Sequence, residues 1–334
     1  MKHFCLLLSL SAMFVACSSA QKKENNAKTS ADYAKTITAE DLKKDLYIYA
    51  SDEFEGRNTG EPGQKKAVEF IKERYKNLNI PSPIAPGDYF QEIPESYFSG
   101  RAKGDSENVL AYIKGSEKQD EVLVISAHLD HVGTKDGEVY NGADDDGSGT
   151  VAILAMAKAF KKAADEGQGP KRSILFLHVT GEEIGLFGSR YYTDADPVFP
   201  LENTIANLNI DMIGRVDDKH EDDRNYVYLI GSDKLSTELH DISEKVNKTY
   251  YNINLDYTYN DDNDPNRFYY RSDHYNFAKN NIPVIFYFNG THDDYHQPTD
   301  TPDKIEYDLL EIRTRLIFST AWELANRDKR VVLD

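Results

Sequence analysis

The sequence predicts an α/β protein with a mostly parallel, mixed central sheet and helices on both faces of that sheet. Two observations predict this fold class. Short apolar runs alternate with segments of helical periodicity along most of the chain, which is the pattern of strand and helix units in a covered sheet. The 334 residues contain no internal repeat and no heptad pattern, so neither a solenoid nor a coiled coil competes with this interpretation.

The N-terminal segment has the pattern of a secretory signal. A charged start precedes an apolar run over residues 4–15, which is far shorter than the roughly 20 residues that a membrane span needs. The stretch FVAC (residues 14–17) resembles a bacterial lipobox. This resemblance implies a signal peptide over residues 1–17 and a lipid anchor on Cys17, which would hold the protein on the outer side of a membrane in the bacterial cell envelope, on the periplasmic side or at the cell surface. Plain secretion with cleavage after Ala20 is the alternative.

The segment that follows separates this anchor from the folded part of the chain. Residues 18–36 are polar and lack apolar periodicity, so we expect a flexible leash there. Residues 37–334 then form a single domain. It begins with two helices, the first capped at Thr38 and the second over residues 64–78, where the stretch IPSP ends it.

Strands and helices alternate through the rest of the domain. We expect strands at residues 108–113, 121–127, 173–179, 204–210, 226–231 and 282–288. We expect helices over residues 149–164, 186–192, 235–249 and 307–327.

Residue types that bind metals or transfer protons follow four of these strands. They are His128, Asp130 and His131, then Glu182 and Glu183, then Asp211, and finally Asp293, Asp294, Tyr295 and His296. Ligands of open α/β sheets bind outside the carboxyl ends of the strands, so these side chains are expected at one edge. Each residue alone has an ordinary structural explanation, but their coincidence indicates a site.

The stretch NGADDDGSGT adds three consecutive carboxylates, Asp144 to Asp146. Adjacent like charges repel, so the stretch is either a solvated turn or a site for a cation. Cys5 and Cys17 are the only cysteines, and a chain without Cys5 and with an acylated Cys17 has no free thiol. A metal would therefore be bound by His, Asp and Glu, the ligands of catalytic rather than thiolate structural zinc sites.

The charge balance bears on partners. The chain has 39 basic and 57 acidic residues, a net charge of -18, which argues against nucleic acid and against an anionic membrane surface as partners. A positively charged end of a substrate would be attracted.

Six stretches carry a resemblance to a known family. They are AHLDHVG, NGADDDGSGT, TGEEIGLFGS, NIDMIGR, RSDHYNFA and DYHQPTDT, in that order. Together they resemble the co-catalytic zinc exopeptidases of the bacterial leucyl aminopeptidase and aminopeptidase Y family. The resemblance implies a zinc-exopeptidase (phosphorylase/hydrolase-like) architecture for residues 37–334. The protease-associated insert of many relatives looks absent, since only a short segment separates QEIP from NVLAYI.

The resemblance also implies a site with two zinc ions per chain. His128 and Asp211 would bind one ion, Glu183 and His296 the other, and Asp145 would bridge both. The residues themselves do not distinguish Asp145 from its two neighbours, so that choice rests on the resemblance. The resemblance also implies a cis peptide bond between Asp145 and Asp146.

Three further residues have catalytic roles in this interpretation. Glu182 is the general base, Asp130 accepts the second imidazole N–H of His128, and Tyr295 donates a hydrogen bond to the developing oxyanion. The roles of Arg271, Ser272, Asp273 and His274 stay open.

The expected function is hydrolysis of N-terminal residues from peptides by a two-zinc aminopeptidase. Within the same fold the alternatives are a carboxypeptidase, for which Arg215 and Arg271 are the candidate cations, and a glutaminyl cyclase. From another class, a non-catalytic lipoprotein that binds a partner is the alternative, although Glu182 and all five candidate ligands are present.

Overall fold

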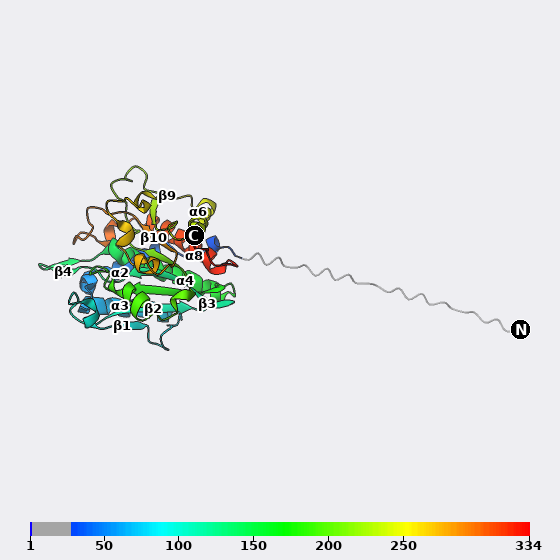
Figure 1. The fold of residues 1–334 in the computed structure, drawn as a ribbon, viewed down its shortest axis with the longest axis horizontal. Helices are drawn as coiled ribbons and strands as arrows, with labels where there is room; N and C mark the ends of the chain where they lie inside the picture. Colours follow the sequence, from blue (N-terminus) through cyan, green and yellow to red (C-terminus); the bar gives the residue numbers. More distant parts are fainter. Residues whose placement is uncertain (2–27) are drawn as a thin grey trace.

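A computed structural model describes Met1 and residues 28–334 of the chain. Figure 1 shows the described domain as a ribbon. The predicted signal peptide with Cys17 and residues 18–27 of the predicted leash lie, apart from Met1, outside the described residues. In the part of the chain that is described, no helix combines the length and the apolar character that crossing a membrane requires.

The centre of the domain is an eight-stranded mixed sheet. In spatial order its strands are β1 (Phe90–Ile93), β2 (Ser106–Ile113), β6 (Arg172–Val179), β3 (Lys118–His128), β7 (Thr204–Ile210), β10 (Val284–Phe288), β8 (Tyr226–Ile230) and β9 (Asn254–Asp256). The four central strands β6, β3, β7 and β10 are parallel, whereas β2 and β8 run antiparallel to them on either side. The predicted fold class is confirmed. The four central strands therefore end at the same edge of the sheet.

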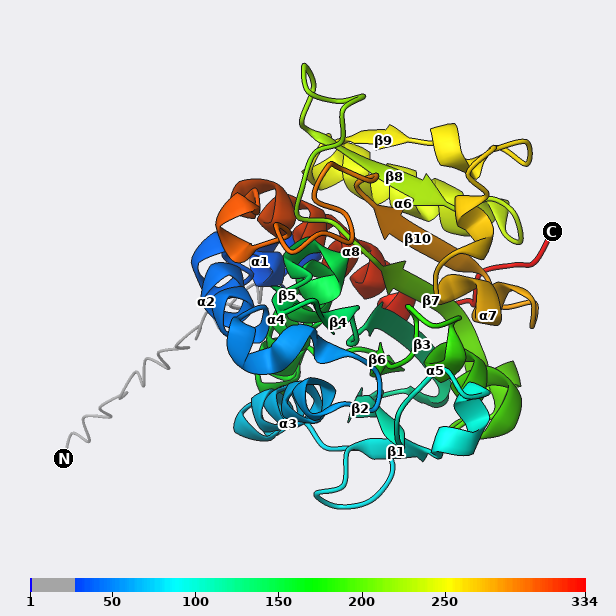
Figure 2. The ribbon, with the colours of Figure 1, turned by 90° about the vertical axis from the view of Figure 1, so that its left-hand side faces the viewer.

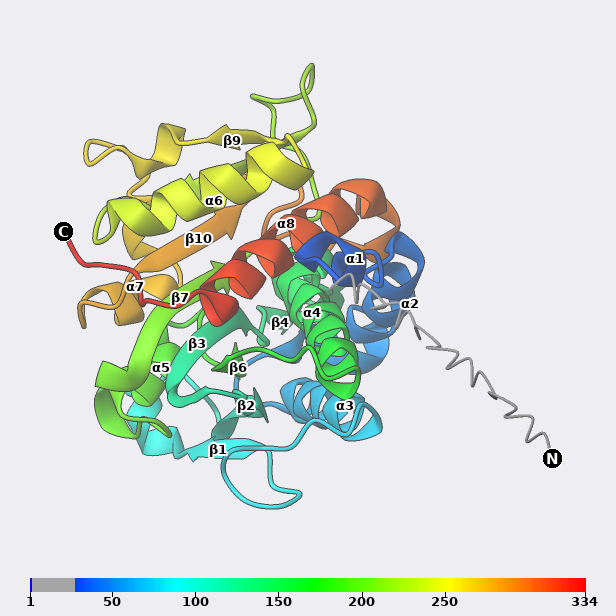
Figure 3. The same ribbon diagram turned by 90° about the vertical axis from the view of Figure 1, so that its right-hand side faces the viewer.

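Helices cover both faces of the sheet. They are α1 (Ser30–Ala34), α2 (Ala39–Tyr49), α3 (Pro62–Asn77), α4 (Gly149–Asp165), α5 (Phe187–Arg190), α6 (Thr237–Tyr250), α7 (His274–Ala278) and α8 (Tyr307–Asn326). Figure 2 shows α5 and α7 beside the strands, and Figure 3, from the opposite side, shows α4, α6 and α8 crossing the other face. A small hairpin, β4 (Gly133–Lys135) and β5 (Glu138–Tyr140), projects beyond the strand ends.

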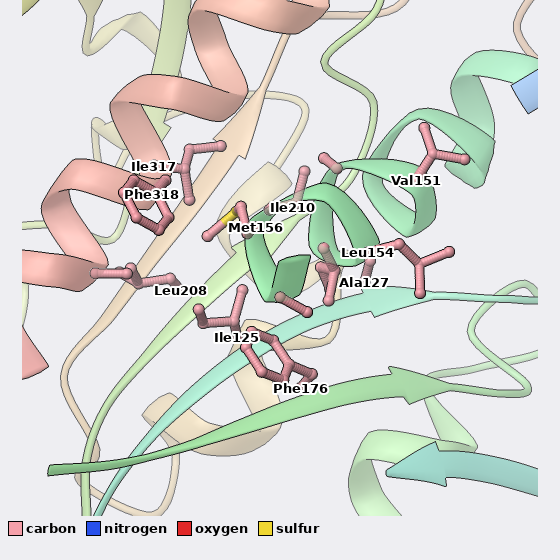
Figure 4. Close-up of a cluster of buried hydrophobic side chains, with 14 of the residues drawn as sticks. Ile125, Ala127, Val151, Leu154, Met156, Phe176, Leu208, Ile210, Ile317 and Phe318 are labelled. Atoms are coloured by element: carbon pink, nitrogen blue, oxygen red, sulfur yellow. The ribbon is translucent and has the colours of Figure 1, made fainter. Parts of the chain in front are cut away.

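The alternation of side chains along β3 explains the two covered faces. Leu123 and Ile125 belong to the apolar cluster under α4 and α8, whereas Val122 and Val124 belong to the cluster under α7. Figure 4 shows the first cluster, in which side chains of α4, α8 and three strands meet. Each fully buried aliphatic side chain contributes roughly 1.5 to 3 kcal/mol, so the central strands form a rigid platform.

The structure corrects the predicted leash at its C-terminal end. Residues 30–34 form helix α1, in which Thr29 and Asp32 make a capping box. The ring of Tyr33 is buried and stacks on Trp322 of α8 at 5.2 Å between centroids. A helix of five residues is too short to show a periodic apolar face, so no local pattern predicts it. The packed domain therefore begins before residue 37.

The other predicted helices and strands are present with small shifts at their ends. The predicted cap is confirmed, since the side chain of Thr38 accepts a hydrogen bond from the backbone of Asp41. The helix expected over residues 186–192 is a short α-helix followed by a π-helical turn at Tyr191–Ala195. The strands β1 and β9 and the helix α7, all of five residues or fewer, were not predicted.

Candidate metal centre

The carboxyl ends of the central strands bring the predicted site residues together. His128 is the last residue of β3, Asp211 directly follows β7, and Glu182 and Glu183 follow β6. The loop after β10 supplies His296. The aspartate stretch forms a π-helical turn, Ala143–Ser148, that leads into α4 and lies against this edge, with all three aspartates buried.

The carboxylate of Asp145 is shared by two groups of donor atoms. Its Oδ1 lies 3.1 Å from His128 Nε2, which is also 3.7 Å from Asp211 Oδ1. Its Oδ2 lies 3.0 Å from His296 Nε2, which is also 3.1 Å from Glu183 Oε2. All five predicted metal-ligand residues therefore form one cluster, in which the two oxygens of Asp145 face opposite groups. The peptide bond between Asp145 and Asp146 is cis, as the resemblance implies.

Asp146 faces main-chain donors instead of the centre. Its Oδ2 accepts the backbone N–H of His128 at 3.1 Å, and its Oδ1 accepts the N–H groups of Gly149 at 3.0 Å and Met212 at 3.1 Å. The carboxylate thus joins the ends of β3 and β7 to the start of α4. Since its oxygens are engaged in this way, Asp146 is a scaffold residue.

Asp144 is engaged on the other side of the turn. Its Oδ1 accepts the N–H of Gly214 at 2.7 Å, and its Oδ2 lies 3.1 Å from His292 Nε2. Asp300 holds the turn in place, because its carboxylate accepts hydrogen bonds from the backbone N–H groups of both Asp144 and Asp145. These contacts leave Asp145 as the aspartate that faces His128 and His296.

Gly142 permits the close approach of this turn. Its φ of 52° lies in the left-handed region, and a Cβ there would come within 2.2 Å of the Asp145 carbonyl oxygen and 2.5 Å of the His131 ring. Any side chain at position 142 would therefore push the turn away from the centre.

His131 is a member of the cluster to which the sequence reasoning gave no role. It is fully buried, and its Nδ1 lies 2.7 Å from Glu183 Oε1 and 3.7 Å from Asp145 Oδ2. Among the described residues, two groups have donor atoms close enough together to bind one metal ion: His128 with Asp145 and Asp211, and His131 with Asp145 and Glu183. Its place in the strand-end stretch HLDH was a signal, but the stretch alone does not show which way the ring points.

The cluster fits divalent cations. The ring nitrogens His128 Nε2 and His296 Nε2 and the carboxylate oxygen Glu183 Oε1 are buried without a well-directed hydrogen bond in the described part of the molecule. Buried polar atoms are normally satisfied, so these atoms are available to a ligand. Imidazole nitrogens and carboxylate oxygens without thiolates are the donors of catalytic zinc sites.

The charges in the cluster favour a positive occupant. Burial alone would lower the pKa of His128, but the carboxylates of Asp145 and Asp211 raise it well above its ordinary value. Against the same effect of burial, Asp145 and Glu183 raise the pKa of His296 to about 10. Burial favours a protonated Asp145, but His128 and His296 hold its carboxyl pKa well below the usual range. Positive charge, as protons or as a metal, is therefore stabilised here.

Glu182 lies beside the cluster and belongs to neither metal-ligand group. Its side chain lines a cavity together with Asp145, Asp211 and Tyr295. Burial, with added repulsion from Asp211 and Glu183, raises the pKa of Glu182 well above its ordinary value. A carboxylate with a raised pKa is a stronger proton acceptor, which is what a general base requires.

The predicted contact of Asp130 needs a correction. His128 Nδ1 lies 3.0 Å from the main-chain oxygen of Asp130, whereas the nearer carboxylate oxygen is 3.8 Å away. That carboxylate instead accepts the hydroxyl of Thr59 at 2.7 Å and the backbone N–H of Glu182 at 3.2 Å. Asp130 thus orients His128 through its main chain, because its side chain is turned toward the loop that carries Glu182 and Glu183.

Tyr295 occupies the wall of the same cavity. Its ring stacks on His296 at 3.9 Å between centroids, and its side chain lines the cavity with Glu182. Burial and the nearby carboxylates raise the pKa of Tyr295, so the phenol stays protonated and keeps its O–H as a donor. The residue therefore both packs against His296 and faces the cavity.

The stretch RSDH, whose roles the sequence left open, supports Asp211. The hydroxyl of Ser272 donates to Asp211 Oδ2 at 2.6 Å and accepts from the side chain of Asn209 at 2.9 Å. Asp273 is buried and accepts a hydrogen bond from the Ser189 hydroxyl; burial raises its pKa to about 7. Arg271 is exposed and lines the cavities beside the cluster.

Comparison with known proteins gives a consistent result. The sequence model of Peptidase family M28 matches residues 108–321. A protein described as "Probable glutamate carboxypeptidase" from Arthroderma benhamiae is 35% identical over 105 residues, which cover 31% of this chain and 14% of that protein. "Leucine aminopeptidase 2" from Arthroderma otae is 27% identical over 241 residues, which cover 64% of this chain and 44% of that protein. The matches thus span less than half the length of either relative.

Solved structures share the fold. The LapA aminopeptidase of Legionella pneumophila superposes with a TM-score of 0.69 at 21% sequence identity, and the superposition covers 90% of this chain and 75% of that one. At this level of identity the superposition establishes the architecture of the sheet and its helices.

Proposed function

Because this chain belongs to peptidase family M28, we propose that it is an aminopeptidase that uses two zinc ions to hydrolyse N-terminal residues from peptides. The observation that carries the proposal is the position of Asp145. Its two carboxylate oxygens face two separate nitrogen and oxygen groups, at 3.1 Å from His128 and 3.0 Å from His296. One carboxylate between two such groups is the arrangement that a two-metal centre needs.

The residues that would hold the ions are those of the cluster. His128 and Asp211 would bind one zinc, Glu183 and His296 the other, and Asp145 both. When bound, zinc would supply Lewis acidity, which polarises the carbonyl of the scissile amide and makes a nearby water easier to deprotonate.

Glu182 would be the general base. Its carboxylate lines the cavity between the cluster and Tyr295, and its pKa is raised, so it accepts a proton from water and passes it to the leaving amine. Tyr295 would donate its O–H to the oxygen that becomes negative as the amide carbonyl is attacked. Asp130 would position both His128 and the backbone of Glu182.

The cavity beside the cluster has acidic walls that suit the amino end of a substrate. Asp145, Glu182 and Asp211 line the inner cavity together, and a free α-ammonium is stabilised by such carboxylates. Arg215, one of the two candidate cations for a carboxypeptidase, is bound to Asp294 at 2.9 Å.

One peptide offered in three forms tests the proposal. The zinc-loaded enzyme should cleave the peptide with two free ends, fail to cleave the N-acetylated form, and cleave the C-terminally amidated form with release of the first residue. A chelator should abolish the reaction. Cleavage that survives acetylation and is lost on amidation would identify a carboxypeptidase instead.

The remaining alternatives give different results in the same assay. A glutaminyl cyclase would convert an N-terminal glutamine into pyroglutamate and release no amino acid. A partner-binding lipoprotein would leave all three peptides intact at full metal loading.

The anchor is a separate part of the proposal. An acylated Cys17 followed by a polar segment would tether the enzyme to the bacterial cell envelope, with peptides in that compartment as its substrates. Cys17→Ser should then release soluble protein or stall processing. Wild-type protein that begins at Gln21 and lacks an acyl mass would contradict the anchor and leave the peptidase proposal intact.

A further inference from the structure

Two exposed arginines line the wider cavity beside the candidate metal centre. This cavity measures about 790 Å³, and its walls include Arg101 and Arg271 together with Glu182, Glu183 and His296. Both arginine side chains are exposed. Positive charge at this position is notable in a chain whose net charge is -18.

Arg271 is held in place while its guanidinium stays available. The guanidinium lies 4.8 Å from the ring centroid of Phe268, and it makes no hydrogen bond or ion pair with any residue among 28–334 that the structure describes. The next residue, Ser272, donates to Asp211 Oδ2, so the backbone at Arg271 is fixed relative to the centre. Arg215, by contrast, is paired with Asp294.

Arg101 is anchored to the same region from another part of the chain. Its Nη1 donates to the main-chain oxygen of Ile184 at 2.7 Å, next to Glu183. A guanidinium has five N–H donors, so this bond leaves others free to face the cavity. No carboxylate of the described residues forms an ion pair with Arg101.

The two cavities of the site differ in their walls. The narrower one contains Phe268, Phe286 and Phe288 and borders Asp145 and Asp211, so it suits an apolar side chain close to the reacting bond. Arg271 lines both cavities, whereas Arg101 lines only the wider one. A group that contacts both arginines must therefore lie in the wider cavity. This cavity would hold the leaving group, the part of the peptide that follows the first residue.

We propose that Arg101 and Arg271 bind a carboxylate of the leaving group, and this inference rests on the proposed function. Its source is the α-carboxylate of a dipeptide or the side chain of an Asp or Glu in the second position. Paired guanidinium donors suit a carboxylate, and the acidic walls of the narrower cavity attract the α-ammonium at the same time. The enzyme thereby recognises both the α-ammonium and a carboxylate of the second residue, which selects dipeptides or peptides with an acidic second residue.

Binding to a protein with strongly reduced turnover tests the inference directly. The zinc-loaded Glu182→Gln protein is titrated calorimetrically with Leu-Gly and Leu-Gly-amide, and with Leu-Glu-amide and Leu-Gln-amide. We expect the charged member of at least one pair to bind about tenfold more tightly. This gain in affinity lies between the usual contribution of an exposed ion pair and that of a hydrogen bond to a charged group. A preference within the first pair identifies the α-carboxylate as the source, and one within the second identifies the acidic side chain.

Arginine variants in the same background locate the preference. Adding Arg271→Gln or Arg101→Gln should remove most of it. Arg267→Gln is the matched control, because Arg267 belongs to the same loop but stacks on Tyr270 and lines neither cavity. Equal affinities within both pairs, or an equal loss in the Arg267→Gln control, would overturn the inference.

The proposed function has its own readout. Leucyl-p-nitroanilide has a leaving group without a carboxylate, so its hydrolysis by the zinc-loaded protein with Glu182 intact reports aminopeptidase activity alone. Hydrolysis without any carboxylate preference would reject the arginine pair and retain the aminopeptidase. A carboxylate preference in binding without hydrolysis would reject the aminopeptidase.

Discussion

Two buried histidines in this molecule differ in what surrounds them. At the carboxyl edge of the sheet, His128 lies against Asp145 and Asp211, and these carboxylates raise its pKa in spite of burial. Inside the sheet, His178 of β6 contacts the Tyr75 hydroxyl at 2.7 Å, and burial lowers its pKa to about 3. Burial alone keeps an imidazole neutral, so the buried carboxylates are what make positive charge favourable at the edge.

Removal of the Asp145 carboxylate should have the largest effect on the carboxyl edge of the sheet. Asp145→Ala deletes the oxygens that face both His128 and His296, so we expect both metal ions to be lost and turnover to fall to the background level. Metal content after dialysis, measured together with hydrolysis, checks this. Asp293→Ala, an exposed carboxylate in the loop before His296, is the control and should retain both ions. Full metal content in Asp145→Ala would contradict the assignment.

Removing only the base should separate chemistry from metal binding. Glu182→Gln keeps the size and the hydrogen-bonding capacity of the side chain but cannot accept a proton. We expect turnover to fall by roughly two to four orders of magnitude, while metal content stays at the wild-type level. If the variant kept a tenth of the wild-type turnover, Glu182 would not be the base.

His131 tests whether the edge needs more than the five predicted ligand residues. Its Nδ1 lies 2.7 Å from Glu183 Oε1, so His131→Leu should weaken metal binding by roughly 10- to 100-fold, the usual effect of losing a group that orients a ligand. His131→Asn can present an amide N–H near the Nδ1 position and should recover most of that loss. Competition with a chromophoric chelator measures both. Equal affinities in wild type and His131→Leu would show that the residue only fills space.

The interior histidine should affect stability and its dependence on pH. The pKa of His178 is about 3 in the folded protein, below the ordinary value of about 6.5 in an unfolded chain. Between these values the unfolded state binds the extra proton, so stability falls as the pH drops below about 6.5. His178→Gln keeps an acceptor for Tyr75 and removes this titration. The loss of unfolding free energy between pH 7.5 and 5 should then be smaller than in wild type by about 2 kcal/mol. An unchanged pH dependence in denaturant unfolding would contradict this.

Prediction from sequence succeeded where local pattern was sufficient. The helix cap at Thr38 and the strands that end at His128, before Glu182 and before Asp211 follow from short-range periodicity. It failed at α1, where five residues carry too little pattern and where Tyr33 is held by Trp322, almost 300 positions further along the chain.

The aspartate turn shows the same division within one stretch of sequence. Three identical side chains stand in a row, and nothing local distinguishes them. Asp144 and Asp146 are taken up by the backbone N–H groups of Gly214, His128 and Met212, which belong to distant strand ends. Asp145 is left to face His128 and His296.

The sequence by itself therefore determined the central strands, the points at which they end, and the His, Asp and Glu residues that follow them, since each depends on neighbours a few residues apart. The tertiary structure decided which oxygen meets which nitrogen. It turned the Asp130 carboxylate toward Thr59 and left the main-chain oxygen of Asp130 to face His128. It also placed His131 against Glu183, and it paired Arg215 with Asp294 while Arg271 forms no ion pair within residues 28–334. These contacts depend on how segments far apart in the chain pack against one another. No local pattern of the sequence encodes that packing.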